Sequence, residues 1–154
     1  MHDIKASVIL AEQIENNDIK GIIQSLPSRK ENIIWMYLTI KTNLEDEDEI
    51  KIGFDIIKVD DESDGSNFGI ELGEFVVGKT KNKEKRKDIL KNHDNAREFK
   101  HKKGKSIFPY ADIYTIGKKF PPLPPLKSGL YEFVIYEKDD KKNIMLDTFQ
   151  FEVD

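Results

Sequence analysis

The chain has 154 residues, of which 38% are apolar and 35% charged, and its formal net charge is −4. This length supports one domain with a real hydrophobic core. The sequence has no cysteine, which excludes disulfide bonds and thiolate metal sites. No apolar run near the amino end reaches the roughly 7–15 residues of a secretory signal core, and none approaches the ~20 residues of a membrane helix. We therefore expect a single domain, 1–154, that is soluble and cytoplasmic.

Apolar residues recur with period two along most of the chain, which predicts β-strands. The strands expected in chain order cover residues 6–11, 19–26, 33–41, 50–57, 68–77, 107–116, 130–136 and 144–153. The stretch 33–41 is apolar on both faces for most of its length, which is typical of a central strand. Polar turns separate the strands, and neither alternating helices nor a repeat occurs. The series predicts an all-β, antiparallel sandwich or barrel.

One segment, Lys79–Lys105, breaks this pattern. It holds twelve lysine or arginine residues and four acids, a formal charge of +8, which leaves −12 for the rest of the chain. We expect a basic insertion in the form of a long loop or a short helix. Its cations could neutralise the phosphates of a nucleic acid. The residues proposed for that role are Lys83, Lys85, Arg86, Lys87, Arg97, Lys100, Lys102 and Lys103.

A solvated insertion is the stronger interpretation of this segment. Runs of like charge are commonly exposed tails and loops, and only Phe99 is available to stack on a base. The basic segment could lie against the acidic remainder of its own chain or of a second copy. The division of charge therefore also allows self-association, which salt would weaken.

Residues 60–71 have the spacing of a calcium loop. Carboxylates at alternate positions can converge on a hard cation, and Gly65 would allow the sharp turn. The ligands of such a site would be Asp60, Glu62, Asp64 and Glu71. A plain hairpin turn at Asp64-Gly65 is the stronger interpretation, because strands rather than helices flank the loop.

The stretch FPPLPPLK, residues 120–127, contains four of the six prolines. It fits a PxxP ligand for a proline-reading domain. It also fits a stiff connection to the next strand, because Phe120, Leu123 and Leu126 are spaced by three and would line one face of a polyproline helix. We favour the stiff connection.

Gly129, Tyr131 and Phe133 have the spacing with which the penultimate strand of immunoglobulin-like sandwiches begins, Gly-x-Tyr-x-Cys, with Phe133 in the cysteine position. The tyrosine hydroxyl of that strand bonds to the backbone a few residues upstream. Trp35 resembles the core tryptophan of such domains. The alternative is that Tyr131 and Trp35 are ordinary core aromatics of another β-architecture.

The stretches ASVILAEQI, DIKGIIQSL and SGLYEF together resemble those of small uncharacterised bacterial immunoglobulin-like β-sandwich proteins, a family of unknown function. The resemblance implies an antiparallel immunoglobulin-like β-sandwich of about eight strands. It implies no activity.

Motifs for catalysis are missing from the sequence. The three histidines are His2, His93 and His101, and none has the spacing of a paired metal site. No nucleophile elbow or phosphate loop occurs. We expect a protein that is not an enzyme and has no cofactor. The expected function is binding or scaffolding of a protein partner, through a loop end or an exposed sheet edge.

Overall fold

The computed structural model describes residues 4–16, 18–41, 49–59, 69–78 and 113–154, together with ten residues between 84 and 106. Within this part of the chain the strands are β1 (Lys5–Glu15), β2 (Asp18–Ile22), β3 (Ser25–Leu26), β4 (Trp35–Lys41), β5 (Glu49–Lys58), β6 (Gly69–Gly78), β7 (Phe99–His101), β8 (Gly104–Ser106), β9 (Ile113–Lys119), β10 (Gly129–Lys138) and β11 (Asn143–Val153). The described residues include no helix long and apolar enough to cross a membrane.

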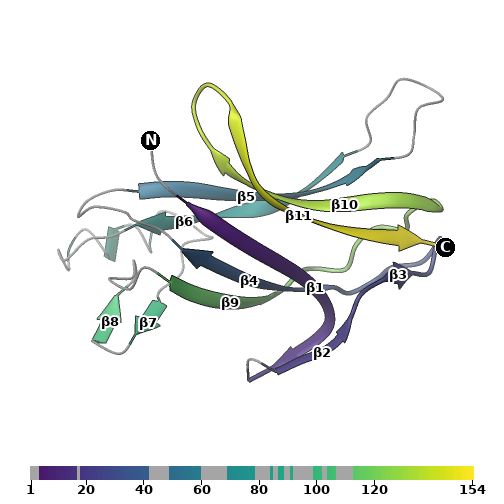
Figure 1. The fold of residues 1–154 in the computed structure, drawn as a ribbon, viewed down its shortest axis with the longest axis horizontal. Helices are drawn as coiled ribbons and strands as arrows, with labels where there is room; N and C mark the ends of the chain where they lie inside the picture. Colours follow the sequence, from purple (N-terminus) through teal and green to yellow (C-terminus); the bar gives the residue numbers. More distant parts are fainter. Residues whose placement is uncertain are drawn as a thin grey trace.

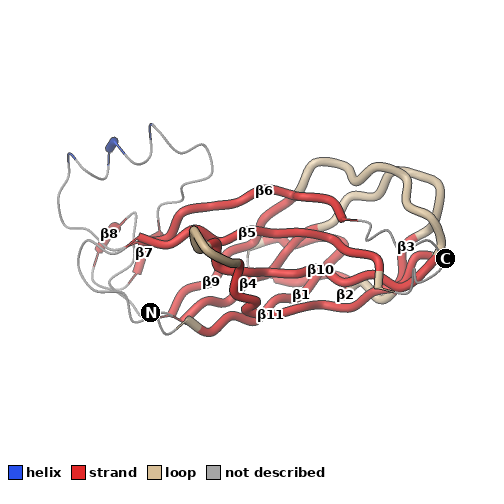
Figure 2. Tube along the Cα trace, turned by 90° about the horizontal axis from the view of Figure 1, so that it is seen from above, coloured by secondary structure: helices blue, strands red, loops and turns tan. Residues whose placement is uncertain are grey.

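Two sheets form the body of the molecule, as the all-β prediction required. One has the order β2-β1-β4-β9 and is antiparallel throughout. The other has the order β3-β11-β10-β5-β6 and is antiparallel except for the parallel pair β3–β11. Figure 1 shows the sheets as two layers, and Figure 2 shows that their strands run along the long axis. As predicted, β4 is a central strand.

The expected strand 19–26 is in fact two strands that belong to different sheets. β2 pairs with β1, and the chain then crosses at Ile23 and Gln24 so that β3 pairs with β11. The prediction missed this crossing because the apolar pattern continues through it. Figure 1 shows β2 and β3 as successive arrows along one edge of the molecule.

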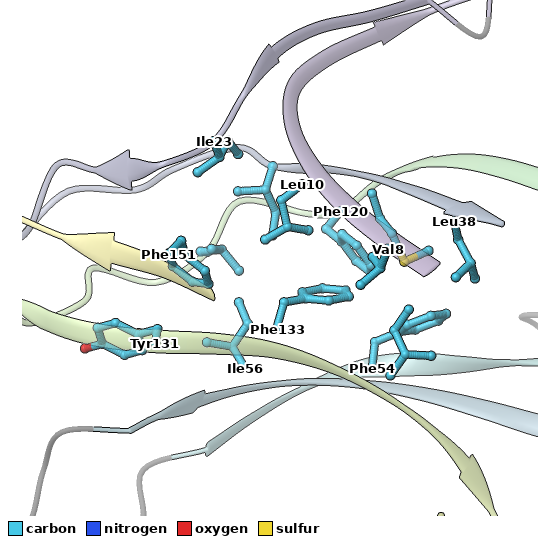
Figure 3. Packing of buried hydrophobic residues seen from close by; sticks show 14 of the residues in the cluster. Val8, Leu10, Ile23, Leu38, Phe54, Ile56, Phe120, Tyr131, Phe133 and Phe151 are labelled. Atoms are coloured by element: carbon cyan, nitrogen blue, oxygen red, sulfur yellow. The ribbon is translucent and has the colours of Figure 1, made fainter. Parts of the chain in front are cut away.

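A single apolar core fills the space between the two sheets. Its centre is aromatic, and Figure 3 shows Phe120 and Phe54 beside Phe133. The ring centroid of Phe120 lies 5.7 Å from that of Phe133 and 5.9 Å from that of Phe54. These separations are typical of favourable tilted and edge-to-face aromatic contacts. The core therefore holds together residues from β5, from β10 and from the proline-rich connection.

The apolar alternation in β6 changes phase partway along the strand, and a β-bulge lies at that point. The register with β5 shifts between Phe54 and Asp55, where Gly73 adopts a φ of 129°. A glycine is needed there because other residues rarely adopt that backbone conformation. After the shift, Phe75 lies opposite Ile52 in the ladder. The strand thus keeps its pairing although the alternation in its sequence changes phase.

The proline-rich stretch is a rigid part of the core boundary. Phe120, Leu123 and Leu126 are each at most 2% exposed, whereas the four prolines between them are exposed. The amide of Leu123 also donates to the carbonyl of Asn32 at 2.8 Å. The period of three places the apolar side chains inward on an extended backbone. This burial supports the stiff-connection interpretation of the stretch.

Tyr131 makes the backbone contact expected from the Gly-x-Tyr spacing. Its hydroxyl donates to the carbonyl oxygen of Lys127 at 2.7 Å, and the side chain is 1% exposed. The ring also stacks on Phe151, with centroids 5.8 Å apart (Figure 3). Gly129, with a φ of 153°, begins the strand, and Phe133 is fully buried. The corner before β10 is therefore held by the partly buried hydrogen bond of Tyr131 and by packing.

The prediction that Trp35 is a core aromatic is wrong. In β4 the side chains of Met36, Leu38 and Ile40 are fully buried, and the residues between them are half-buried. Because side chains alternate along a strand, Trp35 faces the outer side of its sheet. A strand that is apolar on both faces does not reveal from sequence which face is inside.

Candidate partner-binding groove

An open groove of about 480 Å³ lies between β11 and the crossing from β2 to β3. Figure 1 shows these elements near the end of the molecule where β3 and the C-terminus are labelled. The groove is lined by Ile22, Ile23, Gln24, Ser25, Leu130, Phe149, Gln150, Phe151, Glu152 and Asp154. It therefore joins residues from both ends of the sequence at one sheet edge.

The groove exists because one segment serves two sheets. The amide of Ile23 donates to Leu10 of β1 at 2.9 Å, which holds β2 in its own sheet. Immediately afterwards, the amide of Glu152 donates to Gln24 at 3.0 Å, and β3 joins β11. On the β2 side of this junction the segment follows β1 and no longer runs beside β11. The groove lies beside β11 at this point.

The backbone of β11 is open where it faces this space. Amides of alternate residues in a strand point to the same side, and those of Glu152 and Asp154 point toward β3. The amides of Gln150 and Thr148 therefore point to that side as well. The ladder with β3 ends at the pair Ser25–Glu152, and no other described strand pairs with this edge of β11. Of these two residues Gln150 lines the groove, whereas Thr148 adjoins Asp147, where β1 lies against β11.

Asp147 marks the point where β11 approaches β1. Its register opposite Ile135 places it in the inward-facing phase of β11, and its Oδ2 accepts a hydrogen bond from the amide of Val8 at 2.8 Å. This contact satisfies a donor on the free edge of β1. An inward-pointing charge of this kind also protects a strand edge from other strands.

The groove combines an apolar wall with an acidic rim. Ile22 is 56% exposed although it is a large apolar residue, and Phe149 is only partly buried against the core. Among the described residues, Glu152 and Asp154 are the charged residues that line the groove, and both are exposed. No described lysine, arginine or histidine belongs to this lining. The surface can therefore accept apolar side chains on one side and cationic groups on the other.

A second polar cluster lies on the other strands of the same sheet. The Tyr136 hydroxyl donates to Oδ1 of Asp55 at 3.0 Å, and Lys138 forms an exposed ion pair with Glu74 at 2.7 Å. Burial, followed by the hydrogen bond to Asp55, raises the pKa of Tyr136. Burial likewise raises the pKa of Asp55, although the Tyr136 hydrogen bond opposes this. The ring of Tyr136 lies where a side chain on Gly53 would be, so this cluster is packed tightly onto the sheet.

The calcium-loop hypothesis falls mainly outside the described residues. Asp60, Glu62 and Asp64 are not among them, and Glu71 lies on β6 opposite Asp55. Within the part of the chain that the structure describes, no three acidic or histidine side chains are grouped as metal ligands. The pair Asp55 and Glu71 alone does not form a cation site.

The basic segment is described at only a few positions. Of the proposed nucleic-acid contacts, Lys87 is exposed and Lys100 lies in β7, whereas Lys83, Lys85, Arg86, Arg97, Lys102 and Lys103 lie outside the described residues. The expectation of a loop or helix omitted the short pair β7–β8, whose three-residue strands are too short to show a period. Figures 1 and 2 place β7 and β8 at the end of the molecule opposite β3.

Comparisons with known proteins give little further information. No protein-family model matches the chain, and no curated protein matches it by sequence. Among solved structures, the chain is similar to part of a beta-glucosidase from Listeria innocua, determined in complex with isofagomine. The identity is 10% and the TM-score 0.43, over 99% of this chain and 16% of the enzyme. The chain thus spans only a small part of the enzyme's length, and the similarity does not indicate an activity.

Proposed function

We propose that this protein is a non-catalytic binding module that holds an extended segment of a protein partner against the open edge of β11. The observation that carries the proposal is the backbone of Gln150, which no described strand pairs on this side of β11, beside the exposed side chain of Ile22. Addition of a strand to a sheet edge derives affinity from main-chain hydrogen bonds and specificity from alternate side chains. The groove offers both kinds of contact.

The edge of β6 and the free edge of β1 are both protected, whereas β11 carries such a protection at Asp147 and not at Gln150. β6 has a bulge at Gly73, and it carries Glu71 and Glu74 on either side of that bulge. The free edge of β1 has its Val8 amide bonded to Asp147. Bulges and charges of this kind are common protections against unwanted strand pairing. The contrast supports a binding role for the β11 edge.

We also propose that the two-sheet structure is an immunoglobulin-like sandwich. The order β3-β11-β10-β5-β6 corresponds to a GFC-type sheet extended at both edges, with β10 as the strand that follows the tyrosine corner. The hydrogen bond from Tyr131 to Lys127 supports this assignment. Because one fold supports many functions, the proposed binding role depends on the groove and not on the fold.

The proposal of a non-catalytic role is supported by the chemistry of the groove. In the part of the chain that the structure describes, its lining offers amides, one serine and two carboxylates, but no histidine or lysine that could activate the serine. A nucleic-acid role for the basic segment stays a prediction from the sequence.

The experiment uses Gln150→Pro as an edge-blocking variant. Proline removes the amide that points into the groove and leaves the ladder with β10 intact, because that amide is not part of it. Affinity capture from the native host, with the wild-type chain and with Gln150→Pro, should recover a partner only with the wild type. The charge variant Glu71→Gln, on the far strand β6, should recover it normally. A partner retained by Gln150→Pro would reject the proposal.

A further inference from the structure

The groove has two chemically different sides, and both belong to β11. Phe151 is buried and Phe149 packs against the core, so these residues face inward. Gln150 and Glu152 alternate with them, are exposed, and face outward. Ile22 extends the apolar side across the space. An occupant of the groove therefore meets an apolar surface on its inner face and an acidic surface on its outer face.

A strand paired to this edge would present its own side chains alternately to these two surfaces. The residue beside Ile22 and Phe149 must be apolar, because burying a polar group there without a partner is costly. Its immediate neighbours lie beside Thr148 and Gln150, from where a long side chain can extend toward Glu152. An acidic residue at those positions would extend toward Glu152 and Asp154, and the described lining has no cation to compensate. A lysine or arginine would be attracted instead.

The dimensions restrict the contact to a short segment. The groove follows β11 from Phe149 to Glu152, four residues that at about 3.3 Å per residue extend for about 13 Å. Glu152 itself is already paired with β3, so backbone pairing with an occupant is limited to the residues before Glu152. One or two apolar positions and the basic positions between them are enough to fill this length.

We propose that the occupant is an extended segment of a separate protein in which apolar and basic residues alternate, with the apolar residues against Ile22 and Phe149 and the basic residues against Glu152 and Asp154. This inference rests on the proposed binding function and adds the chemistry of the partner. The described strands of the chain's own basic segment lie at the opposite end of the molecule (Figures 1 and 2), so they do not occupy the groove of their own chain.

The test uses three fluorescent peptides of equal length: GSVKVKVSG, GSVEVEVSG and GSTKTKTSG. Fluorescence anisotropy measures their affinity for the full-length protein, and amide hydrogen exchange reports whether Gln150 and Thr148 are protected. We expect the first peptide to bind most tightly, and both substituted peptides to bind at least about tenfold more weakly. Glu152→Gln should weaken the first peptide about two- to fivefold, as for the loss of an exposed ion pair. Glu71→Gln, the matched control on β6, should leave its affinity unchanged.

Each outcome has a distinct meaning. If the acidic peptide binds equally well and protects Gln150 and Thr148, the edge binds peptides but the proposed charge pattern is wrong. If none of the three peptides protects these amides, both the pattern and the binding function are rejected. Sedimentation velocity tests whether a second copy of this chain occupies the groove. A dimer that disappears in Gln150→Pro would identify a second copy in place of a separate protein and would contradict the proposal.

Discussion

The hydrogen bond of Tyr131 provides a quantitative test of the corner before β10. Tyr131→Phe removes the donor to the carbonyl of Lys127 and keeps the ring that stacks on Phe151. Lys127 is exposed, so water can reach part of the released carbonyl. We therefore expect the ordinary net cost of one hydrogen bond, about 1–1.5 kcal/mol in the free energy of unfolding. For a chain of this length, that corresponds to a fall of roughly 2–6 °C in the melting temperature.

The assay is urea unfolding followed by the fluorescence of Trp35, the only tryptophan. Lys127→Ala is the matched control, because the bond uses the main-chain carbonyl and the lysine side chain is exposed. This control should change the free energy of unfolding by less than about 0.5 kcal/mol. Equal and negligible effects of the two substitutions would refute the assigned role of the tyrosine.

Three further predictions use the same unfolding assay. Phe133→Ala should cost about 3–5 kcal/mol, because it leaves a cavity at the centre of the aromatic core. Asp147→Ala should cost about 1–3 kcal/mol by leaving the Val8 amide without its acceptor, whereas Asp147→Asn keeps an oxygen there and should cost less. Burial raises the pKa of Asp55 in the folded state, so its contribution to stability is present at low pH and is lost as the pH rises through that pKa. Asp55→Asn, which still offers Tyr136 an acceptor, should therefore gain stability relative to the wild type between acidic and neutral pH, and a constant difference would contradict this.

The sequence was sufficient to predict most of the long strands and the corner. Period-two patterns such as that around Phe54 identify strands because one face of each is buried. The spacing of Gly129 and Tyr131 predicted a hydrogen bond that forms within a few residues of chain, so no long-range information was needed. The spacing of three from Phe120 to Leu126 likewise predicted which side of the proline-rich stretch faces the core.

Features that depend on sheet edges could not be predicted. The groove depends on the crossing at Ile23 and Gln24, where the chain changes its hydrogen-bonding partner without changing its apolar pattern. It also depends on β11, which is far away in the sequence. The prediction for Trp35 was wrong for a related reason. Both faces of its strand are apolar, and only the packing of the sheets determines which face is buried. The sequence does not show that Ile22 is exposed, because the next apolar residue in the same stretch, Ile23, is buried.

Amide hydrogen exchange along β11 in the free protein tests the open edge most directly. The amides of Phe149 and Phe151 point toward β10 and should exchange slowly, whereas that of Gln150 points into the groove and should exchange at least about a hundredfold faster. The partner or a binding peptide should then slow the exchange of Gln150 specifically. If Gln150 is as protected as its two neighbours in the free protein, the edge is already occupied, and the proposed binding site does not exist.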